Sequence, residues 1–152
     1  MTIALADISN KAEEIVKLSP NDIVIDIGCN DGTLLRSYKS PQIKKIGFEP
    51  AKNLQSYATK GTTKIFNDFF SNTPFKESFP GEKAKIITAI AMFYDLDNPN
   101  SFVADIKKCL HEEGLFVIQM MYLENMMEKV AFDNICHEHL EYYSLTSLKN
   151  LL

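Results

Sequence analysis

The chain alternates short apolar segments with helix-compatible segments five times, and this order limits the fold more than any other feature of the sequence. The apolar segments are rich in β-branched residues and have few polar positions, which is typical of strands buried on both faces of a parallel sheet. Strands that alternate with helices form right-handed crossovers, so the order predicts an α/β fold with a doubly wound parallel sheet and helices on both faces. The predicted strands cover residues 22–28, 45–48, 63–66, 84–92 and 115–121.

The segments between the strands carry the spacing and the capping residues of helices. Asn98 and Pro99 are expected to cap and begin one helix, which ends before Gly114. Ser144 is expected to cap the last helix, whereas residues 69–83, which contain prolines and a glycine, are predicted to form a loop. The other predicted helices cover residues 5–16, 31–39, 51–59 and 122–130, and the buried faces of the two capped helices consist of Phe102, Val103, Ile106 and Leu110 in the first and Leu145, Leu148 and Leu151 in the second.

Composition narrows the class of protein. A chain of 152 residues is expected to form one domain. Its net charge of −4 and the absence of a basic run argue against a nucleic-acid partner. No apolar run approaches the roughly 18 residues of a membrane-spanning helix, and the N-terminus does not resemble a secretory signal. Three cysteines predict neither a disulfide framework nor a zinc ribbon, so we expect a cytoplasmic protein in which Cys109 is a buried apolar residue.

The loop after the first predicted strand is the first candidate binding site. It follows Asp26 and contains Gly28, Asn30 and Asp31, so it lacks the second glycine of a dinucleotide-binding loop. Asp31 stands where a pyrophosphate would lie, and two anions repel each other. The loop therefore favours a ligand without phosphates, and Asp26 suits a ligand with a cationic amine.

Glu49 and Pro50 end the second predicted strand, 23 residues after Asp26. An acidic residue in this place can accept hydrogen bonds from both hydroxyls of a ribose. An amine, a ribose and no phosphate together describe S-adenosylmethionine. The alternative is that Asp26 and Asp31 cap a helix and that Glu49 is a surface acid.

The segments VIDIGCNDG and GFEP resemble the first two motifs of the class I S-adenosylmethionine-dependent methyltransferases. The resemblance covers about residues 20–121 and implies a Rossmann-like fold with the strand order 3-2-1-4-5, in which the last predicted strand lies at an edge. It also implies that the methionine part of the cofactor lies against the loop, the ribose against Glu49 and the adenine against Asp68 and Phe69, although Phe69 could instead pack in the core. The full predicted cofactor site, for S-adenosylmethionine or its product S-adenosylhomocysteine, is Asp26, Gly28, Cys29, Asn30, Glu49, Pro50, Asp68, Phe69, Ala91 and Met92.

A second cluster places His137 and His139 on either side of Glu138. A histidine with a neighbouring carboxylate suits the role of a general base. Three alternatives are a solvated polar loop, a structural role for the histidines, and metal ligation by Cys136 with both histidines. The spacing is too tight for the usual zinc patterns, so we predict no metal site.

The segment ICHEHLEYYSLTSL, together with VIDIGCNDGTLL, resembles the C-methyltransferases of deoxysugar biosynthesis, which methylate a carbon next to a keto group on a nucleotide-linked sugar. The resemblance implies that His139 is the base and that Glu138 and His137 support it or bind the acceptor. It also implies that the sixth and seventh strands are missing, so we expect residues 1–152 to be a single cofactor-binding domain that is truncated at the C-terminus. The exposed sheet edge could then pair in a homodimer. The alternatives are O- or N-methyl transfer to another small molecule, and a cofactor-binding domain that is inactive without its missing parts.

Overall fold

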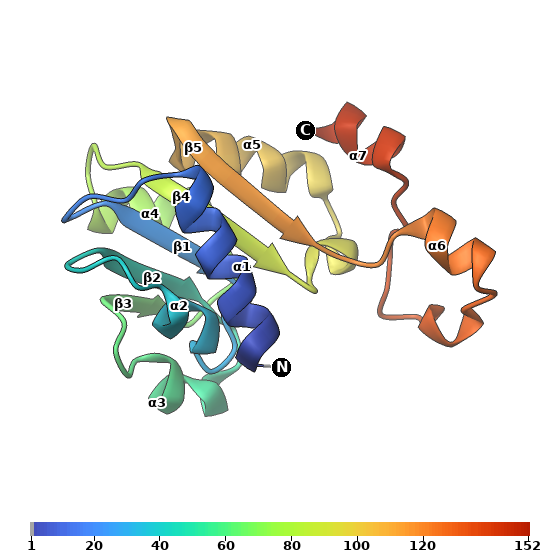
Figure 1. Ribbon diagram of the computed structural model, residues 1–152, viewed down its shortest axis with the longest axis horizontal. Helices are drawn as coiled ribbons and strands as arrows, with labels where there is room; N and C mark the ends of the chain where they lie inside the picture. The colour runs from blue at the N-terminus through green and yellow to red at the C-terminus, as the bar shows by residue number, and fades with distance from the viewer. Residues whose placement is uncertain (1) are drawn as a thin grey trace.

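A computed structural model describes residues 2–152 and contains a five-stranded, wholly parallel sheet with the order β3-β2-β1-β4-β5 (Figure 1). The predicted strand order and the edge position of the last strand are therefore confirmed. The strands are β1 (Ile23–Ile27), β2 (Lys44–Phe48), β3 (Lys64–Phe66), β4 (Ala84–Ile90) and β5 (Leu110–Gln119).

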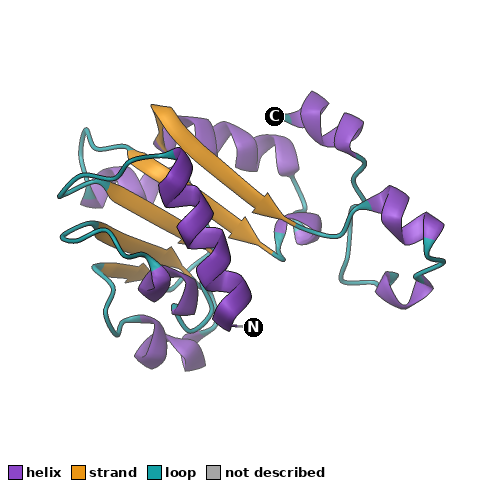
Figure 2. Cartoon of the chain, viewed as in Figure 1, coloured by secondary structure: helices purple, strands orange, loops and turns teal. Residues whose placement is uncertain are grey.

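Burial of both faces of β1 explains why that strand is apolar throughout. Ile23, Ile25 and Ile27 point into one core and Val24 into the other, as the two-residue period of a strand requires. Helices cover each core (Figure 2), with α1, α2 and α3 on the face of Val24 and with α4, α5 and α7 on the opposite face. The helices are α1 (Thr2–Ile15), α2 (Thr33–Ser37), η1 (Lys52–Leu54), α3 (Gln55–Ala58), α4 (Asn72–Ser78), η2 (Phe93–Asp95), α5 (Pro99–Cys109), α6 (Leu123–Glu128), η3 (Phe132–Asn134) and α7 (Leu145–Leu151).

The prediction of a loop over residues 69–83 is wrong in its middle, where α4 forms. Pro74 is tolerated because it lies in the first turn of the helix, where backbone N–H groups have no intrahelical partner. Phe75 is fully buried and anchors the helix on the sheet. One buried aromatic residue thus outweighs a composition that is typical of loops.

The start of β5 also differs from the prediction. The strand begins at Leu110, directly after α5, so that Leu110 belongs to the sheet rather than to the buried face of the helix. Gly114 lies inside the strand instead of ending a helix, and the pairing with β4 shifts register between Ala84 and Ile86.

Both predicted helix caps are confirmed. The side chain of Asn98 accepts a hydrogen bond from the backbone of Ser101, and Ser144 forms a reciprocal capping box with Ser147. Leu148 and Leu151 pack against the core as predicted, whereas Leu145 is exposed. The last helix thus presents a narrower apolar face than its sequence suggested.

The remaining structural predictions have mixed outcomes. Cys109 is buried as predicted, and all three cysteines are free. Over residues 2–152, no helix is both long and apolar enough to cross a membrane. The outer edge of β5 pairs with no other strand of the described chain, so the homodimer remains a prediction.

Candidate functional site

A cleft of about 500 Å³ opens at the carboxyl ends of the strands, where the chain leaves β1 toward β2 on one side and enters β4 from β3 on the other. Ligands of doubly wound sheets bind at such a switch point, and the volume is within the usual range for small-molecule sites. The lining residues are Ile27, Gly28, Phe48, Glu49, Pro50, Asp68, Phe69, Phe70, Ser71, Met92, Asp95, Leu96, Asp97, Asn98, Ser101, Phe102 and Asp105.

Gly28 begins the loop that forms the floor of the cleft. Its φ angle of 69° lies in the left-handed region, which a glycine adopts without strain. The N–H groups of Gly28 and Cys29 both donate to the carbonyl of Phe48, at 2.9 and 3.1 Å, and this ties the loop to β2. Met92 closes the other side, since its Cγ lies 3.5 Å from the place that a Cβ on Gly28 would occupy. A ligand can therefore approach the backbone of Gly28 closely.

Glu49 is the best-ordered polar group on the wall of the cleft. Its side chain is 8 % exposed, and its two carboxylate oxygens accept backbone N–H groups from Asn30 and Ala51, each at 2.9 Å. Each oxygen of a carboxylate has two lone pairs, so both can accept one further hydrogen bond. Glu49 is therefore a fixed acceptor for a pair of hydroxyl groups, and its interpretation as a surface acid is wrong. Asn30 contributes its backbone, while its side chain is exposed.

Asp26 and Cys29 lie beneath the loop rather than on the wall of the cleft. Asp26 is 3 % exposed and accepts a hydrogen bond of 2.6 Å from the hydroxyl of Thr88. Burial raises the pKa of Asp26 to about 7; the Thr88 hydrogen bond opposes this shift and the negative charge of Glu49 adds to it. The thiol of Cys29 packs toward Gly47, and burial raises the pKa of this thiol to about 12. The two side chains can influence a ligand only through the loop or through their electric field.

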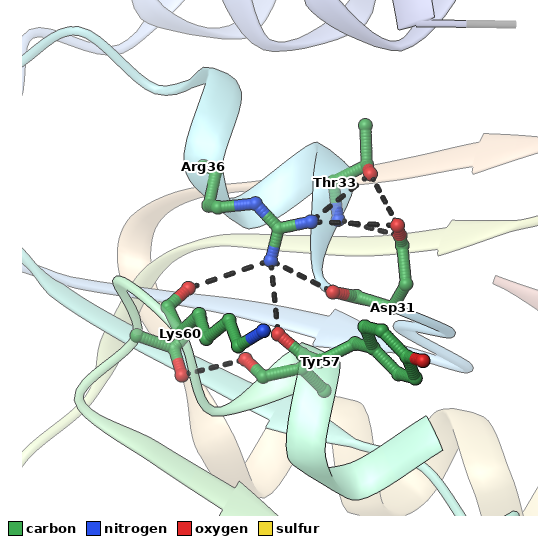
Figure 3. A network of polar contacts seen from close by, with 7 residues as sticks. Asp31, Thr33, Arg36, Tyr57 and Lys60 are labelled. Atoms are coloured by element: carbon green, nitrogen blue, oxygen red, sulfur yellow. Dashed lines mark hydrogen bonds and ion pairs between the residues drawn. The ribbon is translucent and has the colours of Figure 1, made fainter. Parts of the chain in front are cut away.

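Asp31 is engaged with the start of α2, as the alternative interpretation of this residue predicts (Figure 3). It accepts the backbone N–H of Thr33 at 3.0 Å and the hydroxyl of Thr33 at 2.8 Å, and the hydroxyl bond lowers the pKa of Asp31. Arg36 lies 3.4 Å from the same carboxylate and also donates to the carbonyls of Tyr57 and Lys60. Since Arg36 balances its charge, Asp31 opposes a pyrophosphate less strongly than its position in the sequence suggested.

The far side of the cleft contains the residues predicted for the adenine. Asp68 and Phe69 both line it, and the side chain of Phe69 is 77 % exposed, so its interpretation as a core residue is wrong. Phe70 packs against the core instead, with its ring centroid 5.0 Å from that of Phe48. Pro50 lines the cleft as well.

The segment after β4 agrees with the prediction at Met92 but not at Ala91. Met92 lines the cleft, whereas Ala91 does not. Ala91 has a φ angle of 54°, donates its N–H to Gln119 at 2.8 Å and accepts the hydroxyl of Tyr94 at 3.0 Å. Ala91 therefore shapes the turn that leads out of β4 instead of facing a ligand.

Sequence reasoning missed an acidic wall on the side of α5. Asp95, Asp97 and Asp105 line the cleft together with Glu49 and Asp68, and its lining contains no lysine, arginine or histidine. The signal available in the sequence was the pair of aspartates directly after the fourth strand, where ligands of such sheets bind. This charge distribution favours a cation over an anion in the cleft.

The three residues of the second cluster do not meet. His137 and Glu138 are the central residues of a turn closed by a hydrogen bond from His139 to Cys136, and their side chains are 91 % and 74 % exposed. The nitrogen Nε2 of His137 lies 3.7 Å from Oε1 of Glu138. His139 folds back, with Nδ1 2.9 Å from the carbonyl of Asn134. No group of three residues that could hold a metal ion occurs in residues 2–152.

Comparison with known proteins places this geometry in a family. The family model described as a methyltransferase domain matches residues 4–152. The C-methyltransferase NovU of Streptomyces niveus is 27% identical over 139 residues, which are 91% of this chain and 33% of that protein. A tRNA U34 carboxymethyltransferase of Campylobacter jejuni subsp. doylei is also 27% identical, over 84% of this chain and 46% of its own length. The chain thus spans between a third and a half of these relatives.

Solved structures share the fold. The plantazolicin methyltransferase BpumL, crystallised with S-adenosylhomocysteine, superposes with a TM-score of 0.72 at 15% identity, over 98% of this chain and 60% of that one. The cyclopropane synthase MmaA2 from Mycobacterium tuberculosis gives a TM-score of 0.68 at 18% identity, over 98% and 58%. The exposed backbone of Gly28 and the fixed carboxylate of Glu49 fit the S-adenosylmethionine that such methyltransferases use. The chain belongs to the family of methyltransferase domains.

Proposed function

We propose that this domain binds S-adenosylmethionine in the cleft and serves a methyl transfer to a carbon next to a keto group of a nucleotide-linked sugar. The observation that carries the cofactor assignment is Glu49, whose carboxylate is buried, oriented by two backbone N–H groups and open to the cleft. Glu49 is a rigid acceptor of two hydrogen bonds, and it lines the same cleft as Gly28, whose backbone is in the left-handed conformation. This arrangement suits a ligand in which a ribose is attached to a group that contacts the backbone of Gly28.

Each part of the cofactor has a proposed partner. The methionine part lies along the Gly28 loop, under which Asp26 adds negative charge when it is ionised. The ribose hydroxyls bind Glu49. The adenine lies beside Asp68, which can accept a hydrogen bond from its amino group, and against the exposed ring of Phe69.

His139 is the proposed general base. The carbonyl of Asn134 can only accept a hydrogen bond, so the hydrogen of the neutral imidazole lies on Nδ1 and leaves Nε2 free to take a proton. S-adenosylmethionine, when bound, supplies an electrophilic methyl group. The chain contributes position: Nε2 of His139 would take the proton next to the keto group, and the electron pair left on that carbon would form the new bond to the methyl group while the methyl–sulfur bond breaks and S-adenosylhomocysteine leaves. His137 and Glu138, at the exposed tip of the turn, are proposed to contact the acceptor.

The relative NovU supports the C-methyl assignment, because it is named a C-methyltransferase and matches 91% of this chain. The acidic wall limits where the acceptor can lie. A diphosphate would meet five carboxylates and no basic side chain in the cleft, so the phosphates of a nucleotide sugar are proposed to bind outside it. O- or N-methyl transfer to a neutral or cationic acceptor is the second candidate, and the same wall favours it. Since the relatives extend well beyond this chain, a binding domain that needs further parts for turnover is the third.

Calorimetry with S-adenosylmethionine tests the cofactor assignment directly on this chain. We expect saturable binding of one cofactor per chain and no comparable binding of NAD, because the cleft is lined by acidic side chains and by no basic side chain that could pair with a pyrophosphate. NAD that bound as tightly as S-adenosylmethionine would refute the assignment. Turnover of a keto-sugar nucleotide, measured with the whole enzyme, then separates the first candidate from the other two.

A Glu49→Ala variant is expected to bind S-adenosylmethionine at least tenfold more weakly. It removes two hydrogen bonds to a charged acceptor, which contribute about 1.5–3 kcal/mol each. Glu49→Gln keeps one strong acceptor, so its affinity for S-adenosylmethionine should lie between those of Glu49→Ala and the wild type. Glu77→Ala, which removes an exposed carboxylate on α4, is the matched control. If Glu49→Ala and Glu77→Ala bound S-adenosylmethionine with equal calorimetric affinity, Glu49 would not be part of the binding site.

A further inference from the structure

The segment that contains His139 is docked on the turn after β4 by backbone hydrogen bonds. The carbonyl of Tyr94 in η2 accepts the N–H groups of both Leu140 and Glu141, each at 3.0 Å. The hydroxyl of Tyr94 donates to the carbonyl of Ala91, so the tyrosine is held at both ends. In Figure 1 the chain between α6 and α7 extends beyond the carboxyl ends of β4 and β5, and Tyr94 connects it to the sheet.

The ring of His139 is fixed by two contacts. Its Nδ1 lies 2.9 Å from the carbonyl of Asn134, and its ring packs edge-on against Tyr94 with centroids 4.5 Å apart. Tyr142 lies farther away, at 6.5 Å. None of the residues from 2 to 152 forms a hydrogen bond with Nε2 of His139. Tyr94 thus determines the plane of the imidazole and leaves its basic nitrogen open.

Asp95 follows Tyr94 directly and stands at the rim of the cleft. Partial desolvation raises the pKa of Asp95, the charge of His139 lowers it, and the charge of Glu138 raises it. The other titratable groups near the imidazole are Tyr94, Cys136, Tyr142 and the exposed Glu141. Asp95 is the one of these acids that also lines the cleft.

We propose that Tyr94 and Asp95 are positioning residues for His139, Tyr94 by holding the imidazole plane and Asp95 by stabilising the imidazolium. The role in turnover rests on the proposed function. When Nε2 takes the proton from the acceptor carbon, the electron pair of the C–H bond stays on that carbon and the positive charge appears on the imidazole. Asp95 takes no proton in this step.

The pairing of Asp95 with His139 can be tested on this chain without any turnover. Carboxyl ¹³C NMR follows the titration of Asp95 in the wild type, in His139→Gln and in His137→Gln. Loss of the imidazolium charge should raise the pKa of Asp95 in His139→Gln. His137→Gln removes an exposed imidazole and should leave the pKa of Asp95 unchanged. Equal values in all three proteins, or equal shifts in both variants, would overturn the pairing. Amide spectra of the two variants check that both are folded.

The effect on turnover is measured in the whole enzyme. We expect Asp95→Asn and Tyr94→Ala each to lower kcat severalfold, up to about tenfold. Asp95→Glu, which keeps the charge, should restore part of the loss. Asp133→Asn removes an exposed carboxylate of the same segment and is the matched control. An Asp95→Asn enzyme as fast as Asp133→Asn would refute the role of Asp95. If the wild type also failed to turn over, the proposed function would fail, and the NMR titration would still decide the pairing.

Discussion

His139→Ala is expected to lower turnover by a factor on the order of 10²–10⁴, the usual contribution of a general base. Affinity for S-adenosylmethionine should stay almost unchanged, because the cofactor partners lie on the Gly28 loop and at Glu49, whereas His139 lies against Tyr94. His137→Ala should lower turnover less than His139→Ala does, since the side chain of His137 is 91 % exposed.

Two measurements check the role of His139 in the whole enzyme. Steady-state kinetics gives kcat and the KM of each substrate, and exchange of deuterium at the acceptor carbon reports the proton transfer alone. Both should fall together in His139→Ala. Exchange that persisted undiminished would assign the base to His137 or to a residue outside this chain. Weaker cofactor binding in the variant would indicate instead that the turn after β4 has moved.

Asp26 is expected to make the stability of the unliganded domain fall as the pH rises. Its pKa is about 7 in the folded chain, chiefly because of burial, and 3.8 when unfolded, so between these values the folded state binds more protons than the unfolded state. The free energy of unfolding therefore decreases as the pH rises through this window. At about 1.4 kcal/mol for each pKa unit, the full decrease is about 4 kcal/mol. Asp26→Asn keeps an acceptor for Thr88 and removes the charge, so the variant should lack this decrease.

Urea unfolding of the wild type and of Asp26→Asn at pH 5 and pH 8 measures the effect. Between pH 5 and pH 8 the wild type should lose about 3 kcal/mol more stability than the variant, because part of the decrease already occurs below pH 5. Glu13 and Asp31 have lowered pKa values, so the stability they contribute is lost only in more acidic solution and does not enter this comparison. A wild type that was as stable at pH 8 as at pH 5 would show that Asp26 ionises without cost in the folded chain.

The sequence alone determined the sheet, because the pattern that specifies it is local. Five apolar runs in alternation with helices predicted the doubly wound parallel sheet, the resemblance of two motifs implied its order β3-β2-β1-β4-β5, and the caps at Asn98 and Ser144 were predicted from single residues. The order of the strands also placed the candidate site, since all carboxyl ends of a parallel sheet meet at one edge. Local sequence patterns gave the wrong secondary structure where burial of a single side chain stabilised a helix, as Phe75 does in α4.

Only the tertiary structure decided what each site residue does, since contacts between residues far apart in the chain set burial, charge and orientation. Asp26 and Glu49 are both acids at the ends of strands, yet packing buries Asp26 beneath the loop and leaves Glu49 facing the cleft. His137 and His139 are two residues apart, and only the resemblance to the C-methyltransferases, not the local pattern, singled out His139 as the base. The carbonyl of Tyr94, 46 positions upstream of Leu140, docks the segment so that the imidazole of His139 packs against Tyr94 while that of His137 points into solvent. The hydrophobic periodicity of the sequence cannot predict such a contact, because the contact forms only after the sheet has brought the two turns together.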